Sequence, residues 1–315
     1  MLKLAIVLTL FLSVNAKMIT RTKVQMGTFV SISLDEKDKK HFKKAFRIID
    51  DVEKSLSSFN DKSPLYKLNQ NRYTRLTPYL YEALKLSQKY YENTDGYFDI
   101  TIGSITKDAY RFGLNERVPT NKELHDNNVS FNALMFNKDE ARLKNGIKID
   151  LGGMGKGYGV SKVVKYLKLH DILEAKIAAS GDIRCLLSCR IEVNNPFTDK
   201  ALASFSTRYK DMGISTSGNY EHYVKTKKNN HLINPKTKQS QQNFISITLI
   251  SKLPSSDLDA YTTAVSVMPT KRAYEFLNSL PLGYIVLQSN KDLIVSENID
   301  NYVENIILSK SSQKR

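Results

Sequence analysis

The sequence predicts an α+β protein with one compact domain after a short leader. Amphipathic helical segments and alternating strand segments both occur, but without the regular strand-helix repeat that predicts a doubly wound sheet. The chain of 315 residues is long enough to bury a sizeable core, and no Pro/Gly/Ser-rich linker divides it. We therefore expect mixed, largely antiparallel sheets packed against helices in a single unit.

Periodicity and capping place the elements in order. Thr77 suits a helix N-cap and Pro78 the first helical position, so a helix begins here. We expect the other helices at residues 37–56, 159–170, 257–268 and 270–280. For the segment 93–113 we expect a turn followed by an extended run and a short helix. We expect strands at residues 25–34, 146–151, 174–180, 189–193, 243–251 and 283–289, and a strand that runs into a turn at 232–235.

Residues 1–16 have the pattern of a cleavable secretory signal peptide. A single lysine precedes an apolar run, and small residues precede a cut after Ala16. The apolar run is short for a transmembrane anchor, and no cysteine stands at the cut to carry a lipid. We expect residues 17–315 to form the functional domain, soluble outside the cytoplasm.

The chain is basic, with 47 Lys and Arg against 32 Asp and Glu, a formal charge of +15. Because no basic stripe carries interleaved aromatic residues, we interpret this charge as solvated lysine faces and expect no nucleic-acid partner. A positive field would still attract a polyanionic cofactor. The only cysteines, Cys185 and Cys189, cannot form a zinc site alone, and their spacing leaves open whether they form a disulfide across a tight hairpin.

The glycine-rich stretch "IKIDLGGMGKGYGVSK" at residues 147–162 fits neither nucleotide-binding fingerprint. A P-loop would need glycine where Asp150 stands and Ser or Thr after Lys156, and no register satisfies G-x-G-x-x-G. A strand that runs through such a turn into a helix still presents backbone amides to an anion, and Lys156 adds positive charge. A purely structural turn is the alternative interpretation.

Two further segments carry residues that suit catalysis. Asp259 and Thr263 are four residues apart, so a carboxylate and a hydroxyl share one helix face, as hard oxygen ligands of Mg²⁺ can. A capping Asp beside an unrelated Thr is the alternative. His231 stands before "LINP" and could serve as a base, although a lone histidine is more often structural.

Taken together and in order, these segments resemble the ApbE-like family of FAD:protein FMN transferases, which implies an ApbE-like, T-fold-like domain. The resemblance runs from about residue 25 to 297. It is carried by "MGT" (26–28), "TDGYFDITIG" (94–103), "DLGGMGKGYG" (150–159), "SGDIR" (180–184), "ISTSGNYE" (214–221), "HLINPKT" (231–237) and "LDAYTTAV" (258–265).

The resemblance implies the site residues and their roles. It implies that Mg²⁺ is bound by the side chains of Asp259 and Thr263 and by the backbone carbonyl of Gly153, and that His231 helps to deprotonate the acceptor hydroxyl. It places the FAD-binding positions at Met26, Phe59, Tyr97, Phe98, Asp99, Asp150 and Lys156.

The resemblance also implies an activity: Mg²⁺-dependent transfer of the FMN half of FAD to a Thr or Ser hydroxyl of an acceptor protein, with release of AMP. The implied acceptors are FMN-binding subunits of membrane redox complexes, and the implied location is the periplasm. The sequence departs from the family where the usual "DPRTG" reads "NPKTK" at 234–238, and it contains no Trp. Two alternatives therefore remain: hydrolysis of FAD to FMN and AMP, and FAD binding without turnover.

Overall fold

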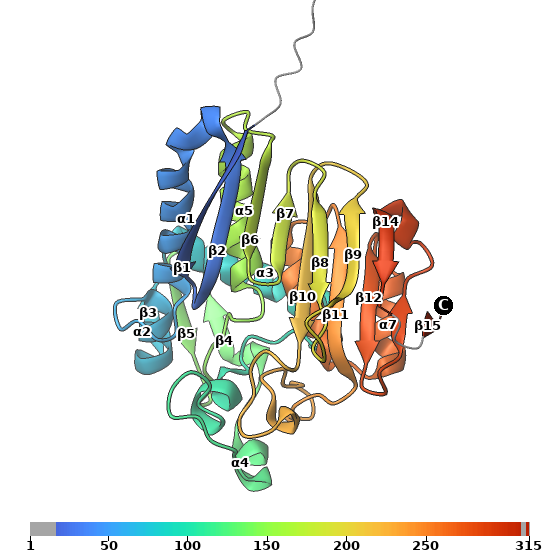
Figure 1. The fold of residues 1–315 in the computed structure, drawn as a ribbon. Coiled ribbons are helices and arrows are strands. Elements are labelled where there is room, and N and C mark those ends of the chain that lie inside the picture. Colours follow the sequence, from blue (N-terminus) through green and yellow to red (C-terminus); the bar gives the residue numbers. More distant parts are fainter. Residues whose placement is uncertain (1–16, 310–312, 315) are drawn as a thin grey trace, which may run out of the picture.

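The computed structural model describes residues 17–309 and the backbone of residues 313–314, so the expected signal peptide at 1–16 lies outside the described residues. Helices and antiparallel sheets combine in one unit, which confirms the expected α+β class (Figure 1). Within the described part of the chain, no helix combines the length and apolar character needed to cross a membrane.

The largest sheet contains nine of the described strands, all antiparallel to their neighbours except for the parallel last pair. Across the sheet the order is β1 (Met18–Gln25), β2 (Thr28–Asp35), β6 (Ala175–Ala179), β7 (Asp182–Cys185), β10 (Met212–Gly218), β11 (Phe244–Ser251), β12 (Gly283–Gln288), β13 (Leu293–Val295) and β15 (Gln313–Lys314). The strand β2 shows why these segments form a sheet, because Val30, Ile32 and Leu34 alternate along it and are fully buried.

Two three-stranded sheets accompany it. One has the order β14 (Val303–Leu308), β9 (Ala201–Thr207), β8 (Arg190–Asn194), and the other β3 (Tyr73–Arg75), β5 (Glu140–Leu143), β4 (Leu134–Phe136). A disulfide joins Cys185 to Cys189 across the turn between β7 and β8, which answers the question that their spacing left open.

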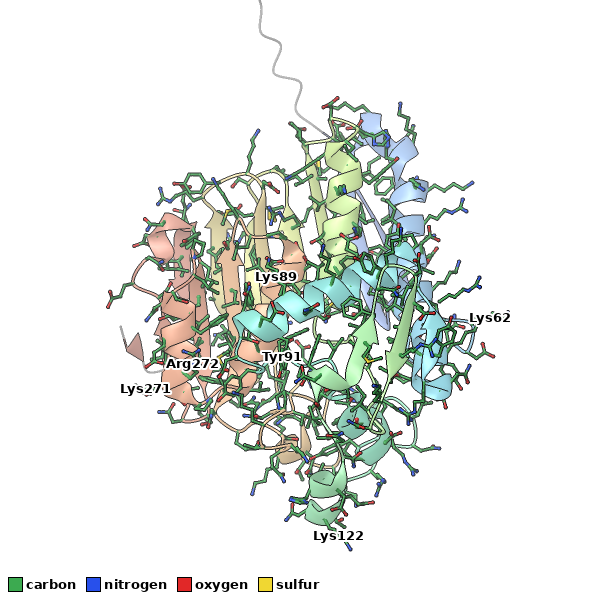
Figure 2. All side chains as sticks on the ribbon, turned by 180° about the vertical axis from the view of Figure 1, so that it is seen from behind. Lys62, Lys89, Tyr91, Lys122, Lys271 and Arg272 are labelled. Carbon is green, nitrogen blue, oxygen red and sulfur yellow. A yellow bond between two sulfur atoms is a disulfide. The ribbon has the colours of Figure 1, made fainter. Side chains whose placement is uncertain are left out.

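The helices lie mainly behind the large sheet in the view of Figure 1. They are α1 (Phe42–Leu56), α2 (Pro64–Asn71), α3 (Pro78–Asn93), α4 (Asn121–Asp126), α5 (Gly155–Lys168), α6 (Ser255–Val267) and α7 (Thr270–Asn278), with a π-helix at Ser104–Ala109. As expected, Thr77 caps α3, since its hydroxyl accepts a hydrogen bond of 3.2 Å from the amide of Leu80. Seen from behind, Lys62, Lys89, Lys122 and Lys271 are spread over the surface rather than gathered in one patch (Figure 2).

The core has three main parts. One face of β2 and β6 packs on α1 and α5, and the adjoining stretch of the sheet packs its inner face on α6, α3 and α7. The opposite face of β10 to β13 is covered by the sheet β14-β9-β8. Nearly every residue of α6 is buried, so this helix runs through the middle of the protein and fixes whatever it carries.

Two of the expected strands are wrong. Residues 146–151 are extended but form only a single bridge, between Lys148 and Ile102. The side chain of Asn69 takes the place of a neighbouring strand, because its amide nitrogen donates to the Ile149 carbonyl and its oxygen accepts from the Ile149 amide, at 2.8 and 2.7 Å. The segment 232–235 likewise forms one isolated bridge, from Ile233 to Ser240.

Candidate active site

All the site residues predicted from the sequence line one cavity of about 480 Å³. The chain brings them there from widely separated segments. These are the β1–β2 turn, the loop between α1 and α2, the loop after α3, the turn before α5 and its first residues, the loop before β11 and the middle of α6. They are Met26, Phe59, Tyr97, Phe98, Asp99, Asp150, Gly153, Lys156, His231, Asp259 and Thr263.

One wall of the cavity is the crossing of α5 and α6, where the glycine-rich turn meets the buried helix. The Thr263 hydroxyl donates to the Gly153 carbonyl at 3.0 Å, and the Gly157 amide donates to Asp259 Oδ2 at 2.8 Å. Gly157 must be glycine, because a Cβ there would lie 2.2 Å from the carbonyl oxygen of Ser255. The turn and α6 therefore hold each other in register.

These contacts bring together a carbonyl, a carboxylate and a hydroxyl, which is the donor chemistry that Mg²⁺ prefers. Asp259 is only 3% exposed, and burial raises the pKa of its carboxyl more than Lys156 and the Gly157 amide lower it. A buried carboxylate whose hydrogen-bond partners are the backbone amides of Gly157 and Lys156 has capacity for a cation, so Gly153, Asp259 and Thr263 fit the ion. Among residues 17–309 no group of three or more His, Cys, Asp or Glu side chains forms a metal-binding cluster, so this oxygen set is of a different kind.

Lys156 projects from the first turn of α5 into a pocket of negative charge. Its Nζ lies 3.4 Å from Oδ2 of the buried Asp182, whose Oδ1 accepts a hydrogen bond of 2.6 Å from Ser215. The charges of Asp259, Asp182 and Glu221 raise the pKa of Lys156, so it stays protonated. The sequence did not identify Asp182 as part of the site, although it lies in the quoted motif "SGDIR". Nothing local to that motif indicates that its partner, Lys156, lies 26 residues away in the chain.

Asp150 is held by a second lysine that the sequence analysis did not single out. Lys107, on the π-helix, lies 3.2 Å from Asp150 Oδ2, and the Thr106 hydroxyl donates to the same oxygen at 2.6 Å. Burial alone would raise the pKa of Asp150, but Lys107, Thr106 and the Gly152 amide lower it below its usual value. Lys107 also lies 4.5 Å from the ring centroid of Phe59, and both line the cavity.

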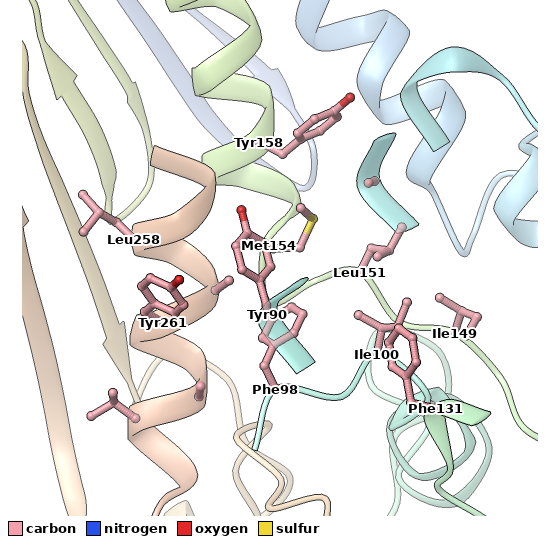
Figure 3. Packing of buried hydrophobic residues seen from close by; sticks show 14 of the residues in the cluster. Tyr90, Phe98, Ile100, Phe131, Ile149, Leu151, Met154, Tyr158, Leu258 and Tyr261 are labelled. Atoms are coloured by element: carbon pink, nitrogen blue, oxygen red, sulfur yellow. The ribbon is translucent and has the colours of Figure 1, made fainter. Parts of the chain in front are cut away.

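The aromatic residues of "GYFD" have unequal exposure. Phe98 is 3% exposed and packs edge-on against Tyr90 at 5.5 Å in the core (Figure 3), and it also lines the cavity. Tyr97 is more exposed and lies 4.4 Å below the ammonium group of Lys236. Asp99 accepts two hydrogen bonds from Thr101, at 2.8 and 2.7 Å, which fix the loop behind the cavity.

Met26 lies at the tip of the β1–β2 hairpin in the left-handed conformation, with φ of 53°. Gly27 follows at 70°, so the pair forms the two-residue turn that suits the twist of a hairpin. Left-handed backbone is unfavourable for methionine, and here it brings the side chain against Gly155 and Gly159 of α5. This strain places an apolar side chain at the cavity wall.

His231 has the geometry of a neutral base. Its Nδ1 lies 3.0 Å from the His222 carbonyl oxygen, and because a carbonyl only accepts, Nδ1 carries the proton and Nε2 the lone pair. Burial lowers the pKa of His231 to about 4, and the positive charge of Lys156 also lowers it. The imidazole is therefore neutral at pH 7.

Asn234 is the first residue of the "NPKTK" segment, which differs from the "DPRTG" usual in the family. It stabilises the turn that follows His231. Its side-chain oxygen accepts from the amides of Lys236 and Thr237 at 2.8 and 3.2 Å. Its side-chain nitrogen donates to the Val267 carbonyl at 2.7 Å, a bond that a carboxylate could not make. The departure is thus accommodated by the local structure.

Fold and site together define an α+β protein with a lysine-containing cavity that an oxygen donor set and a neutral histidine both line. The sequence matches the ApbE family over residues 26–286, and the chain belongs to this family. It is 27% identical over 273 residues to a protein of Buchnera aphidicola named FAD:protein FMN transferase, covering 79% of each chain. It is 26% identical over 268 residues to the protein of that name from Vibrio cholerae, covering 76% of this chain and 77% of the relative.

Solved structures have the same fold. The crystal structure of the ApbE protein from Thermotoga maritima superposes with a TM-score of 0.83 at 22% identity, covering 92% of this chain and all of that one. The flavin transferase ApbE from Vibrio cholerae superposes with a TM-score of 0.79 at 20% identity, covering 91% of this chain and all of that one. These similarities confirm the expected ApbE-like domain.

Proposed function

We propose that this protein transfers the FMN part of FAD to a Thr or Ser hydroxyl of an acceptor protein, with release of AMP, in a Mg²⁺-dependent reaction. The observation that carries the proposal is the convergence of Gly153, Asp259 and Thr263 on the cavity that His231 and Lys156 also line. The names of the curated relatives, FAD:protein FMN transferase, support the same activity.

Each part of the cavity has a role in this reaction. Lys156 and Lys107 suit the pyrophosphate of FAD, and the apolar and aromatic groups Met26, Phe59 and Tyr97 suit its flat rings. Gly153, Asp259 and Thr263 would hold Mg²⁺, which when bound neutralises negative charge that develops on the phosphate oxygens.

The acceptor hydroxyl would lose its proton to His231 Nε2 as its oxygen attacks the FMN-side phosphorus. A new P–O bond forms to the acceptor, the bond between that phosphorus and the bridging oxygen breaks, and AMP leaves with the electron pair. A histidine with its proton fixed on Nδ1 is ready to take a second one on Nε2. Lys156 would keep the pyrophosphate in line for attack.

Two other activities would use the same cavity. If water replaced the acceptor hydroxyl, the protein would split FAD into FMN and AMP. If the altered "NPKTK" segment abolished turnover, it would be a periplasmic FAD-binding protein. The bonds of Asn234 favour an intact turn beside His231, which speaks against loss of turnover. The names of the curated relatives support transfer over hydrolysis.

One experiment separates the three. Residues 17–315 are incubated with FAD, Mg²⁺ and an FMN-binding acceptor domain of a membrane redox complex, and the intact acceptor is weighed by mass spectrometry. An FMN-sized gain on a Thr or Ser peptide supports transfer. Free FMN and AMP without that gain would show hydrolysis, and intact FAD would show binding alone.

We also propose that the protein works in the periplasm after removal of residues 1–16. The sequence pattern of this segment is the support, and the test is the N-terminal sequence of the protein recovered from the periplasmic fraction. A chain that begins at Lys17 is expected. A chain that keeps Met1 would contradict the proposal.

A further inference from the structure

The orientation of His231 depends on His222, whose own side chain is hydrogen-bonded to Glu116. The His222 carbonyl accepts from His231 twice, from its backbone amide at 3.1 Å and from Nδ1 at 3.0 Å. The two rings lie 5.9 Å apart, both along the cavity wall. The position of the His222 backbone thus decides where Nε2 of His231 points.

The side chain of His222 is anchored by Glu116. His222 Nε2 donates to Glu116 Oε1 at 2.6 Å, and the same carboxylate oxygen accepts from the Gly113 amide at 2.9 Å. These two bonds, the Gly113 amide first, lower the pKa of Glu116, so it is ionised at neutral pH. The Phe112 ring packs edge-on against the His222 ring at 4.9 Å and fixes its plane.

The loop that supplies Glu116 is itself tightly wound. Arg111, Gly113 and Asn115 all have positive φ, of 58°, 85° and 48°, and for Arg111 this conformation is unfavourable, whereas glycine and asparagine adopt it readily. A Cβ on Gly113 would lie 2.9 Å from the Phe59 ring, so the loop is also pressed against a cavity residue. Such strain persists only where the surrounding structure imposes it.

We propose that Glu116 and His222 are positioning residues that orient His231 for proton transfer. The inference rests on the proposed function, in which His231 is the base. Glu116 holds the His222 side chain, the His222 carbonyl fixes the Nδ1–H tautomer of His231, and Nε2 is thereby presented to the acceptor hydroxyl. Neither residue was identified from the sequence, because Glu116 and His222 are far apart along the chain.

The test compares Glu116→Ala with Glu116→Gln and with a matched control, Glu140→Ala. The Glu140 side chain is 35% exposed against 32% for Glu116, and it pairs with Tyr73 and Arg142 on the small sheet outside the cavity. We expect E116A to lower kcat for FMN transfer roughly ten- to a hundredfold while leaving KM for FAD unchanged, since a base displaced by about 1 Å loses that much. E116Q keeps an acceptor oxygen and should recover part of the rate, and E140A should match wild type.

A second measurement does not depend on turnover. The ¹⁵N shifts of the His231 ring report its tautomer, and we expect the Nδ1–H form in wild type and E140A but exchange between both tautomers in E116A. Thermal unfolding and FAD affinity identify any variant that misfolds. Wild-type kcat and an unchanged tautomer in E116A would overturn the inference, as would a raised KM for FAD with kcat unchanged. If wild type transfers no FMN, the proposed function fails, and the tautomer still tests the contact.

Discussion

At the scale of single residues, the cavity depends on buried charges that lie beside charges of opposite sign. Lys156 lies among Asp182, Asp259 and Glu221, and Asp150 lies beside Lys107. Removal of one partner from such a set leaves another charge unpaired in a poorly solvated place, which is strongly unfavourable. The informative substitutions are therefore those that keep the shape of a side chain and remove one of its charges or hydrogen-bonding groups.

The first prediction concerns Asp259. Asp259→Asn keeps the hydrogen bond from Gly157 but removes the carboxylate charge that a divalent ion needs, so we expect FMN transfer to fall below detection while FAD still binds. Transfer is measured as acceptor mass over a range of Mg²⁺ concentrations. Thr263→Ser, which keeps the hydroxyl, is the control and should retain most activity. Undiminished transfer by D259N would refute the metal assignment.

The second prediction concerns the pH dependence of His231. Its folded pKa of about 4 lies below the ordinary value of 6.5, so the neutral form persists as pH falls from 7 to 5. Transfer rates should hold over that range and decline towards pH 4. As pH falls, His231 binds a proton in the unfolded chain before it does so in the folded protein. The contribution of the buried neutral imidazole to the free energy of unfolding is therefore fully present above pH 6.5 and is lost as pH falls towards 4.

His231→Gln supplies the comparison. Between pH 6.5 and 4, the unfolding free energy of this variant should fall by roughly 1 to 3 kcal/mol less than that of wild type. Denaturant titration at each pH measures both. Transfer by this variant should be greatly reduced with FAD still bound. A half-maximal loss of wild-type activity near pH 6.5 would show that His231 is solvated rather than buried.

At the scale of elements, the crossing of α5 and α6 is the feature on which the site depends, and it gives the third prediction. A Cβ at Gly157 would lie 2.2 Å from backbone and 2.6 Å from Asp259 Cβ, whereas one at Gly155 would meet only the flexible Met26 end at 3.6 Å. Gly157→Ala should lower the free energy of unfolding by at least about 2 kcal/mol and weaken transfer.

Gly155→Ala is the matched control on the same helix turn. It should be neutral or stabilising by up to about 1 kcal/mol, because alanine favours the helix more than glycine does. Both values come from denaturant unfolding. Equal stability of the two variants would mean that α6 can move away from α5 without loss.

The sequence predicts elements best where one face is buried. The helix α3 was placed by its Thr77 cap and Pro78, and β2 by its alternation. The strand β10 was missed because "MGISTSG" is small and polar, yet its centre is buried between β7 and β11. The expected strand at 146–151 failed for the opposite reason: its pattern is strand-like, but the Asn69 side chain rather than a strand occupies its edge.

At the scale of the whole molecule, the site is a long-range construction. The family resemblance identified residues that line the cavity, but local pattern could not show that Lys107, Asp182 and Glu116 contact residues of its wall. Those residues act through partners that lie far away in the chain. The large sheet and α6 supply the rigid frame, and the loops that carry Phe59, Tyr97 and His231 extend from it, as is common for binding sites.

The net charge gives the fourth prediction, which concerns the whole surface. At +15, the protein has a field that attracts the anionic pyrophosphate of FAD, and salt screens that field over a Debye length of about 10 Å at 0.1 M and about 3 Å at 1 M. We expect the dissociation constant for FAD to rise several-fold between about 0.05 and 0.5 M NaCl, as measured by quenching of flavin fluorescence.

Riboflavin is the comparison ligand, because it keeps the isoalloxazine ring of FAD and lacks the pyrophosphate together with the adenosine. Its affinity should be nearly independent of salt if attraction to the pyrophosphate is the cause. A common salt dependence for both ligands would instead indicate a change in the cavity itself. An FAD affinity that did not depend on salt would contradict the prediction. It would mean that Asp150 and Asp182 neutralise Lys107 and Lys156 at short range and that the surface lysines contribute nothing to FAD binding.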